Sequence, residues 1–403
     1  MNKLRSNGVE SLAIPHNTNY SGGASFSLND YNGGPIDEEY AKNRSLNEPL
    51  VEITQVKGTS ETHPLISKND EWAAFEAKTG VEAEKLVSNL KGGYVRDAYL
   101  RGLTLAERGL TNPFKFGLIG SSDSHVGGPS DSEEFFFSKV GLLDGTAELR
   151  GSIPFNRFYG TFLKVLRPNM LKEVDGKTYF SASDRLIQFA ASGLAGVWAE
   201  ENTREAIYDA LKRKETFATS GPRMKVRFFA GYDLENSKLD DLSLIQDAYR
   251  SSIPMGGTLN ISANKNPTFL VWAIADPVGA PLQRTQIIKG WLEDGEHKEK
   301  VFDIACSDGL SVDPETYRCP DNNAWVDLSN CSISADSGAR EMKVFWQDPE
   351  FKKDQGAFYY SRVLENPVCR WSTWDSVRNG QKPRSDIPAT IQERVWSSPI
   401  WFK

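Results

Sequence analysis

The pattern of apolar positions divides the chain at about residue 222. Before it, short apolar runs alternate with segments of helical spacing, which is typical of an α/β fold. We expect strands at 9–17, 48–58 and 114–120, and a further strand in TFATSG (216–221). Helices are expected at 69–80, 92–109 and from 202, where Asn202 and Glu205 form a capping box, with a shorter helical run near 183–193.

From about Pro222 the pattern changes to short β-branched or aromatic runs that turn-rich segments separate. Examples are KVRFFAGY, TFLVWAIA, QRTQIIKGWLE and AFYYSRVLE. Such runs are typical of an antiparallel sheet or sandwich. We therefore predict an α/β domain over 1–221, interrupted by an irregular insertion at about 121–180, and a β-rich domain over 222–403.

Composition excludes some classes of function. The 403 residues carry a formal net charge of −7 and show no basic stripe, so nucleic acid is not an expected partner. No run of 18 apolar residues is present, so no membrane span is expected. A small-molecule substrate, including an anionic one, remains compatible with this charge. The sequence predicts no oligomeric state.

The four cysteines, Cys306, Cys319, Cys331 and Cys369, all lie in the last hundred residues, and none forms a CxxC pair. Zinc-ribbon spacing is therefore absent. Either they are buried thiols, or they form one or two disulfides that need an oxidising compartment. We favour disulfides at Cys319 and Cys331.

Chemistry-bearing side chains follow the ends of the expected strands. Three of the four histidines lie on strand ends or in the loops that leave them, and His297 lies in a charged turn. Because reactive groups collect at the carboxyl ends of parallel strands, these side chains are candidates for one site. They are His16 after the first strand, Glu52 on the second, Glu61 and His63 in the next loop, and Asp123 and His125 after the third.

Imidazole together with carboxylate suits zinc, manganese or iron, and such ions lower the pKa of a bound water. The alternative is structural: Asp123 caps a turn, His125 is a partly buried histidine with its hydrogen bonds satisfied, and Glu52 lies on the polar face of an edge strand. The clustering of scarce histidines favours a metal site. No G-x-S-x-G elbow and no P-loop lysine motif is present.

Several motifs carry a family resemblance. The segments LAIPHN, EPLVEITQVKGTSETHP, NPFKFGLIGSSDSH, ATSGPRMKVRFF and RVLENPVCRWSTWD, with PATIQERVWSSPIW near the C-terminus, span most of the chain. They resemble the bacterial family known as domain of unknown function 3604. That family is similar to the polymerase-and-histidinol-phosphatase (PHP) superfamily of metal-dependent hydrolases, whose fold is a distorted (β/α)7 barrel.

The resemblance implies a site with two or three divalent metal ions (zinc, manganese or iron) at the carboxyl ends of the strands. The metal ligands implied are Asp123 and His125 in GSSDSH, His16 in PHN, and then His63 and Glu52. Glu61 and His63 are the candidates for proton transfer. The implied reaction is hydrolysis of phosphoesters or related bonds by a metal-bound hydroxide.

The sequence departs from the superfamily in one respect, because no H-x-H motif is present. The superfamily carries that motif on its first strand. We therefore expect an N-terminally incomplete form of a PHP-type barrel, with a half-built metal site and impaired activity. The parent protein would be periplasmic or secreted, in keeping with the cysteines.

Two alternatives remain open. The aromatic residues of CRWSTWD (369–375) and VWSSPIWF (395–402) could make the β-rich half a glycan-binding or peptide-binding module, although core packing also explains them. The chain could also be an inactive fragment that folds without catalysing a reaction.

Overall fold

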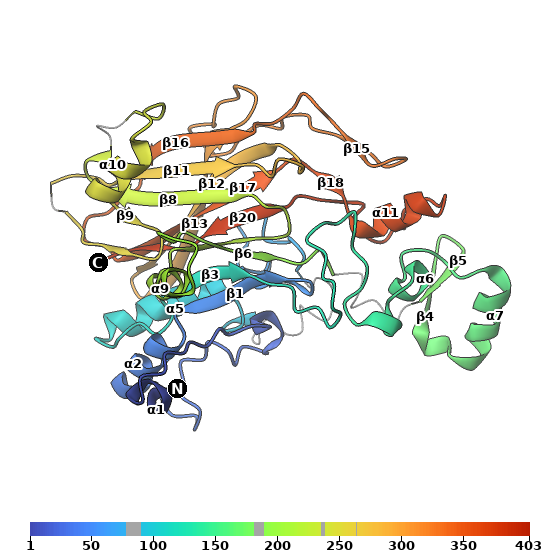
Figure 1. Cartoon of the computed structure of the whole chain (residues 1–403), viewed down its shortest axis with the longest axis horizontal. Helices are drawn as coiled ribbons and strands as arrows, with labels where there is room; N and C mark the ends of the chain where they lie inside the picture. The colour runs from blue at the N-terminus through green and yellow to red at the C-terminus, as the bar shows by residue number, and fades with distance from the viewer. Residues whose placement is uncertain (78–89, 181–188, 235–237, 263) are drawn as a thin grey trace.

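The computed structural model describes residues 1–77, 90–180, 189–234, 238–262 and 264–403. Figure 1 shows the strands stacked through the middle of the molecule, with α1 (Asn2–Ser6) and α2 (Glu38–Asn47) on one side of them. The described helices include none that is long and apolar enough to cross a membrane. The fold mixes helices and strands, as the sequence predicts.

A small sheet lies nearest to these helices. Its strand order is β2-β1-β3, formed by β1 (Leu50–Gln55), β2 (Gly58–Thr59) and β3 (Gly117–Gly120). β1 and β3 run parallel, and α5 (Val95–Glu107) lies between them in sequence. All six residues of β1 are buried, because its apolar run is covered on both faces. The predicted strands at 48–58 and 114–120 and the predicted helix at 92–109 are confirmed.

Two larger sheets make up the rest of the core. The first has the order β10-β21-β17-β20-β7-β6, and β12 pairs with both β17 and β13. The second has the order β16-β11-β8-β9. The strands of the first are β6 (Leu194–Val197), β7 (Thr216–Thr219), β10 (Thr258–Leu259), β12 (Leu282–Glu293), β13 (Glu296–Cys306), β17 (Ala357–Glu365), β20 (Arg394–Ser397) and β21 (Ile400–Phe402). Those of the second are β8 (Lys225–Gly231), β9 (Ile253–Pro254), β11 (Thr268–Ile274) and β16 (Glu341–Gln347).

These two sheets pack face to face through aromatic side chains. The ring of Phe269 on β11 lies 4.7 Å from that of Tyr359 on β17 and 5.6 Å from that of Phe402 on β21. A large apolar core lies between the two sheets, and its side chains are almost all fully buried. The β-rich C-terminal region is therefore confirmed, whereas the (β/α) barrel stays a prediction.

The predicted boundary at residue 221 runs through a continuous sheet. β7 pairs with β6 on one side and with β20 on the other, so strands from both halves of the chain share one hydrogen-bonded sheet. α9 (Arg204–Arg213) precedes β7 and confirms the helix expected from 202. Its N-cap is Thr203 rather than Asn202, and the Thr203 side chain accepts from the backbone N–H of Ala206 at 3.3 Å.

The last part of the insertion predicted at 121–180 forms a small unit that Figure 1 places at the edge of the molecule, whereas its first residues lie next to β1. It contains α6 (Ala147–Arg150), α7 (Arg157–Leu166), β4 (Leu171–Val174) and β5 (Lys177–Phe180). Arg150 forms two hydrogen bonds, of 2.8 and 3.0 Å, with the carboxylate of Asp375 on α11 (Trp371–Arg378). Arg384 donates to the carbonyl of Gly151 at 2.6 Å. These buried contacts fasten the unit to the β-rich region.

Two expected elements do not form. Residues 9–17 make no strand, because Pro15 has no N–H and the segment shares only isolated hydrogen bonds with its neighbours, such as Glu52 N–H to Pro15 O. Residues 70–77 form successive turns rather than a helix, since the Asp70 side chain binds arginines elsewhere in the fold. The remaining part of that helix, and most of the run at 183–193, lie outside the described residues; residues 189–193 are not helical.

All four cysteines form disulfides, Cys306 with Cys319 and Cys331 with Cys369. Cys319 and Cys331 are therefore disulfide-bonded as favoured, although not to each other. The second disulfide joins β15 (Ser332–Ile333) to β18 (Val368–Cys369), two strands that lie far apart in sequence. The short strands β14 (Val326–Asp327) and β19 (Thr390–Ile391) and the helix α10 (Leu244–Ser251) complete the described elements, with short 3-10 turns at 18–20, 141–143 and 168–170.

Candidate functional site

The candidate site lies where β1 and β3 end. Their parallel pairing sets Glu52 beside Ile119. Beyond the last paired residues, Ser121 N–H donates to Thr54 O at 3.1 Å and Val56 N–H donates to Ser122 O at 3.4 Å. The loop that carries Asp123 and His125 therefore leaves β3 alongside the end of β1, at the carboxyl edge of the parallel pair.

Asp123 lies at the centre of this loop. Its backbone has a φ of 44°, a left-handed conformation that aspartate tolerates better than most residues. The carboxylate Oδ2 lies 2.5 Å from Lys57 Nζ and 3.2 Å from Lys139 Nζ, and Oδ1 lies 3.7 Å from His125 Nε2. Partial burial favours the neutral acid, but hydrogen bonds from the two lysines outweigh it and lower the pKa of Asp123 to about 2.

His125 is open to solvent, with 61% of its side chain exposed, so an incoming ligand could reach the ring. Its backbone is held in place because its N–H donates to Lys139 O at 2.7 Å. Lys139 is itself almost buried, and its ammonium group also donates to the main-chain carbonyl of Asp123. The loop therefore presents one carboxylate and one accessible imidazole on a fixed backbone.

Glu52 is buried beside the loop. Its carboxylate accepts from Ser121 Oγ, and from Gln55 Nε2 at 2.9 Å. The backbone around His16 lies against the same residue, since Glu52 N–H donates to Pro15 O at 3.0 Å. The His16 side chain itself is exposed. The structure thus brings His16 and Glu52 to the end of β1 and Asp123 and His125 to the end of β3.

The chemistry of these donors fits a divalent cation, because carboxylate oxygen and imidazole nitrogen are ligands of zinc, manganese and iron. The distances between these side chains allow only a few of them to bind the same ion. Over the described ranges, no three His, Cys, Asp or Glu side chains gather closely enough to hold an ion. Among the candidate ligands, Asp123 and His125 are the two whose side chains lie close together. The positive charge next to the Asp123 carboxylate comes from Lys57 and Lys139.

His63 lies apart from this loop, in the turn that follows β2. It is 1% exposed, and its ring lies 5.8 Å from that of Tyr94. Its Nδ1 accepts the N–H of Leu65 at 3.2 Å, so a metal could bind only through Nε2. The surroundings of His63 therefore resemble a packed core position more than an open ligand position.

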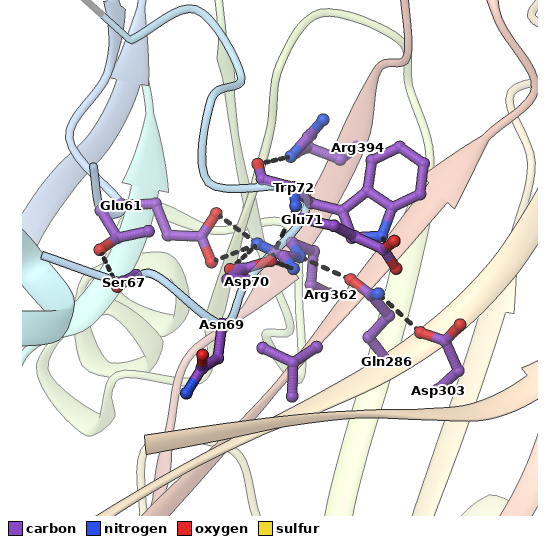
Figure 2. Close-up of polar contacts among 12 residues, drawn as sticks. Glu61, Ser67, Asn69, Asp70, Glu71, Trp72, Gln286, Asp303, Arg362 and Arg394 are labelled. Carbon is purple, nitrogen blue, oxygen red and sulfur yellow. Dashed lines mark hydrogen bonds and ion pairs between the residues drawn. The ribbon is translucent and has the colours of Figure 1, made fainter. Parts of the chain in front are cut away.

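Glu61 belongs to a buried charge cluster, which we define as Glu61, Asp70, Arg96 and Arg362. Arg96 Nη2 lies 2.7 Å from Glu61 Oε1 and 2.8 Å from Asp70 Oδ2. Arg362 on β17 binds both carboxylates as well, at 3.0 Å to Glu61 and 2.8 Å to Asp70 (Figure 2). All four side chains are at most 3% exposed.

The remaining acceptor positions of Glu61 are also filled. Tyr360 OH donates to Oε1 at 2.7 Å, and Trp396 Nε1 donates to Oε2 at 2.8 Å. Burial alone would raise the pKa of Glu61, but the charges of Arg362 and Arg96 outweigh it and leave the pKa below its ordinary value. Glu61 is thus held as an ionised counter-charge, and this geometry does not suit the proton-transfer role expected for it.

The cluster continues into the sheet. Arg362 Nε donates to Gln286 Oε1 at 2.7 Å, and Gln286 Nε2 donates to Asp303 at 2.7 Å (Figure 2). Arg284 is the last member of this chain of contacts, and its guanidinium lies 2.9 Å from the Asp303 carboxylate. Sequence reasoning missed these arginines. The available signal was an arginine inside the apolar run AFYYSRVLE, because a buried arginine in a central strand needs an acidic partner.

The chain belongs to the family described as "Protein of unknown function (DUF3604)", whose sequence model matches residues 1–403. This confirms the first part of the expected resemblance, the membership of the DUF3604 family. The comparisons with curated proteins and with solved structures found no match.

Removing one member of the buried charge cluster should destabilise the fold. Arg362→Met leaves two buried carboxylates with one arginine between them, so we expect a loss of about 3–5 kcal/mol in the free energy of unfolding. Urea denaturation followed by tryptophan fluorescence measures this. The exposed Arg204→Met is the matched control. A loss below about 1 kcal/mol would show that the cluster contributes little.

The cluster should also make stability depend on pH. Burial raises the pKa of Asp70, but Arg362 and Arg96 lower it far below the ordinary value. The native state therefore binds fewer protons than the unfolded state, so stability falls as the pH drops below about 5. We expect Asp70→Asn to be less stable at neutral pH but to show a shallower fall between about pH 5 and pH 3. The exposed Asp240→Asn serves as the control, and an unchanged slope in Asp70→Asn would contradict the assignment.

Proposed function

We propose that this chain is a metal-dependent hydrolase of PHP type that acts on a small anionic substrate such as a phosphoester. The observation that carries the proposal is the Asp123–His125 pair on the loop at the carboxyl end of β3, beside Glu52 on the parallel strand β1. That edge is where parallel α/β folds place their reactive groups. The reaction class is the one that the PHP resemblance expected from the sequence implies, and it is part of this proposal.

Asp123 and His125 would hold the ion, and His16 and Glu52 lie at the same strand ends to complete or orient the site. A divalent ion bound there would polarise the scissile bond and lower the pKa of a water molecule. The chain's own residues do the rest. The hydrogen bond from Ser121 fixes the Glu52 carboxylate, and the exposed ring of His125 faces the solvent from which substrate enters.

Lys57 and Lys139 have a further role in this proposal. Both ammonium groups lie on the Asp123 carboxylate, where a cation would compete with them. Once Asp123 binds an ion, the lysines could pair with a phosphoryl group instead, because a dianion attracts ammonium groups strongly. The two lysines therefore suit an anionic substrate better than a neutral one.

We expect weak metal binding and low activity from the residues described. Two donors from one loop bind an ion less tightly than the three or four ligands of a closed site. The chain contains no H-x-H motif that could add a pair of imidazoles. Glu61 is not part of the proposed chemistry, because four side chains occupy its carboxylate.

The alternative of a glycan-binding module loses three of the four tryptophans that suggested it. The fourth, Trp374, is partly exposed, and the Arg378 guanidinium lies 5.2 Å from its ring centre. Trp371, Trp396 and Trp401 are each at most 2% exposed, so their faces pack in the core and offer no platform for a sugar. The disulfides support an oxidising compartment, and we propose a periplasmic or secreted location on that ground.

Metal content and hydrolysis test the proposal together. Purified full-length chain is incubated with Mn²⁺ or Zn²⁺ and desalted. Bound metal is measured by mass spectrometry, and phosphatase activity is followed with p-nitrophenyl phosphate. We expect Asp123→Asn and His125→Ala to lower metal affinity by at least about tenfold, since each removes one of two donors. Activity should fall with them.

His297→Ala is the matched control, because this histidine contacts Thr104 on α5 instead of the strand-end loop. It should leave both metal content and activity unchanged. Equal metal binding by wild type, Asp123→Asn and His125→Ala would contradict the assignment of the site. Metal binding that these variants abolish, without hydrolysis of any phosphoester, would keep the site but overturn the reaction.

A further inference from the structure

A hollow lies at the end of the small sheet opposite to the strand-end loop of Asp123 and His125. Its volume is about 340 Å³, and Pro49, the residue before β1, forms part of its wall. Other walls come from the segment 10–12, from α2 and from α9. The hollow is therefore at the amino edge of β1, whereas Asp123 follows the carboxyl edge of β3. Its volume is at the lower end of the range for small-molecule sites.

The residues that line this hollow are strongly basic. Four of them are Arg5, Lys42, Lys212 and Lys214, and Glu10 is the single acid among the lining residues. Glu10 lies 3.6 Å from Arg5 and 3.3 Å from Lys212, so one carboxylate serves two cations. Lys42 pairs with Glu38 at 3.2 Å, so these four cations share two carboxylates. The charge left over is still positive, in a chain whose net charge is −7. An anion is the ligand that such a surplus attracts.

Two hydroxyl groups in the same hollow have no partner. Ser11 Oγ and Tyr208 OH are both buried, and neither makes a hydrogen bond. An unpaired buried polar group is costly, so each such group needs an explanation. Lys214 adds to this picture, because burial and the nearby Lys115 lower its pKa to about 8. Two hydroxyls without a partner among the described residues, next to a surplus of positive charge, indicate a missing polar ligand.

We propose that this hollow binds a small phosphate monoester, whose phosphate group pairs with Lys212, Lys214 and Arg5 and whose oxygens accept hydrogen bonds from Tyr208 and Ser11. A phosphate dianion carries twice the charge of a carboxylate and has three terminal oxygens, so it can pair with several of these cations at once. The site does not depend on the proposed hydrolase, because it lies at the other edge of the sheet and shares no residue with it.

Calorimetric titration of the full chain tests this with glycerol 3-phosphate, inorganic phosphate and glycerol. We expect both phosphates to bind and glycerol not to bind. The double variant Lys212→Met/Lys214→Met should weaken binding by at least about tenfold, as expected for the loss of charged hydrogen bonds. The exposed Lys238→Met should bind as the wild type does.

Tyr208→Phe separates a ligand role from a structural one. Removing a hydroxyl that has no partner should leave the thermal stability of the ligand-free protein unchanged or raised, while glycerol 3-phosphate binds more weakly. Binding of neither phosphate would overturn the proposal, and so would equal binding by wild type and the Lys212→Met/Lys214→Met variant. A loss of ligand-free stability in Tyr208→Phe would likewise contradict it, because it would show a structural partner for the hydroxyl.

A different observation concerns α7, whose apolar residues face outward. Phe158 is 90% exposed, Phe162 58% and Val165 79%, and Leu166 next to them is 56% exposed. These positions share one face at helical spacing. The opposite side packs on β5, where Gly160 lies so close to Thr178 that a Cβ on the glycine would be 3.3 Å from the threonine Cβ. Because the inner face of α7 packs on β5, its apolar outer face remains exposed to solvent.

Basic residues lie on and near α7, although Lys164 pairs with Glu173 at 2.7 Å and Lys172 with Asp386 at 3.0 Å. Between residues 157 and 177 the chain carries five basic side chains and two acidic ones, a surplus of three positive charges in an acidic protein. Arg157, Lys164 and Arg167 are all exposed. Figure 1 places α7 at the far edge of the molecule, where it can approach a flat surface. An apolar face flanked by cations is typical of helices that lie in a membrane interface.

We infer that α7 docks on an anionic lipid surface. The full chain is mixed with phosphatidylcholine vesicles that contain or lack phosphatidylglycerol, and bound protein is measured by flotation. We expect binding only to the anionic vesicles and weaker binding in high salt. Phe158→Ser/Phe162→Ser should reduce binding by at least about tenfold, because two apolar side chains no longer enter the interface.

Val278→Ser is the matched control, since this apolar side chain is 94% exposed in a turn remote in sequence from α7. It should bind vesicles as the wild type does. Failure of the wild type to bind anionic vesicles would overturn the inference, as would equal binding by Phe158→Ser/Phe162→Ser. Self-association without vesicles that the double variant abolishes would also overturn it, because α7 would then contact a second copy of the chain.

Discussion

The ion pairs among Glu61, Asp70, Arg96 and Arg362 are the interaction on which the rest of the structure depends. Arg362 lies on β17 in the β-rich region, whereas Glu61 and Asp70 lie in the segment between β2 and α5. One arginine thus joins parts of the chain that are 301 residues apart. Buried charges tolerate no missing partner, so this set of contacts fixes the small sheet and α5 against the β17 face.

The same contacts determine which acidic side chains are free to bind a metal ion or transfer a proton. Glu61 has its acceptor positions filled by two arginines, a tyrosine and a tryptophan, and so serves as a counter-charge. Asp123 is only partly buried, with Lys57 and Lys139 on its carboxylate, and its neighbour His125 is exposed. A buried network can be rigid only because it is complete, whereas a reactive site needs a group that can exchange partners. The strand-end loop meets that condition.

Much of the fold could be predicted from the sequence. β1, β3, α5 and the strands β8, β11, β12 and β17 follow runs of apolar residues whose spacing matches the element that forms. The misses have local causes. Pro15 removes an N–H from the expected first strand, and the Asp70 side chain serves arginines elsewhere instead of a helix at 69–80. The pairing of β7 with β20, and of each cysteine with its partner, depends on contacts that no local pattern reveals.

The candidate site shows the same limit. Strand ends in the sequence pointed to Asp123, His125, His16 and Glu52. The structure places Asp123 and His125 on one loop and hydrogen-bonds Ser121 of that loop to Glu52, whereas His16 is linked to Glu52 through the backbone of Pro15. The pattern could not separate these from Glu61 and His63, which have the same residue types in a similar loop. Burial separates Glu61 and His63 from Asp123 and His125, whereas Glu52 is buried like them. For Glu61 the partners Tyr360, Arg362 and Trp396 lie about 300 residues further along the chain.

Anomalous diffraction from crystals of the full chain soaked in Mn²⁺ tests the central claim most directly, because it locates the ion without assuming its ligands. The account predicts a manganese peak beside the Asp123 carboxylate and the His125 ring, and none within coordination distance of Glu61. A peak at Glu61, or a fully loaded crystal with no peak at the strand-end loop, would contradict it.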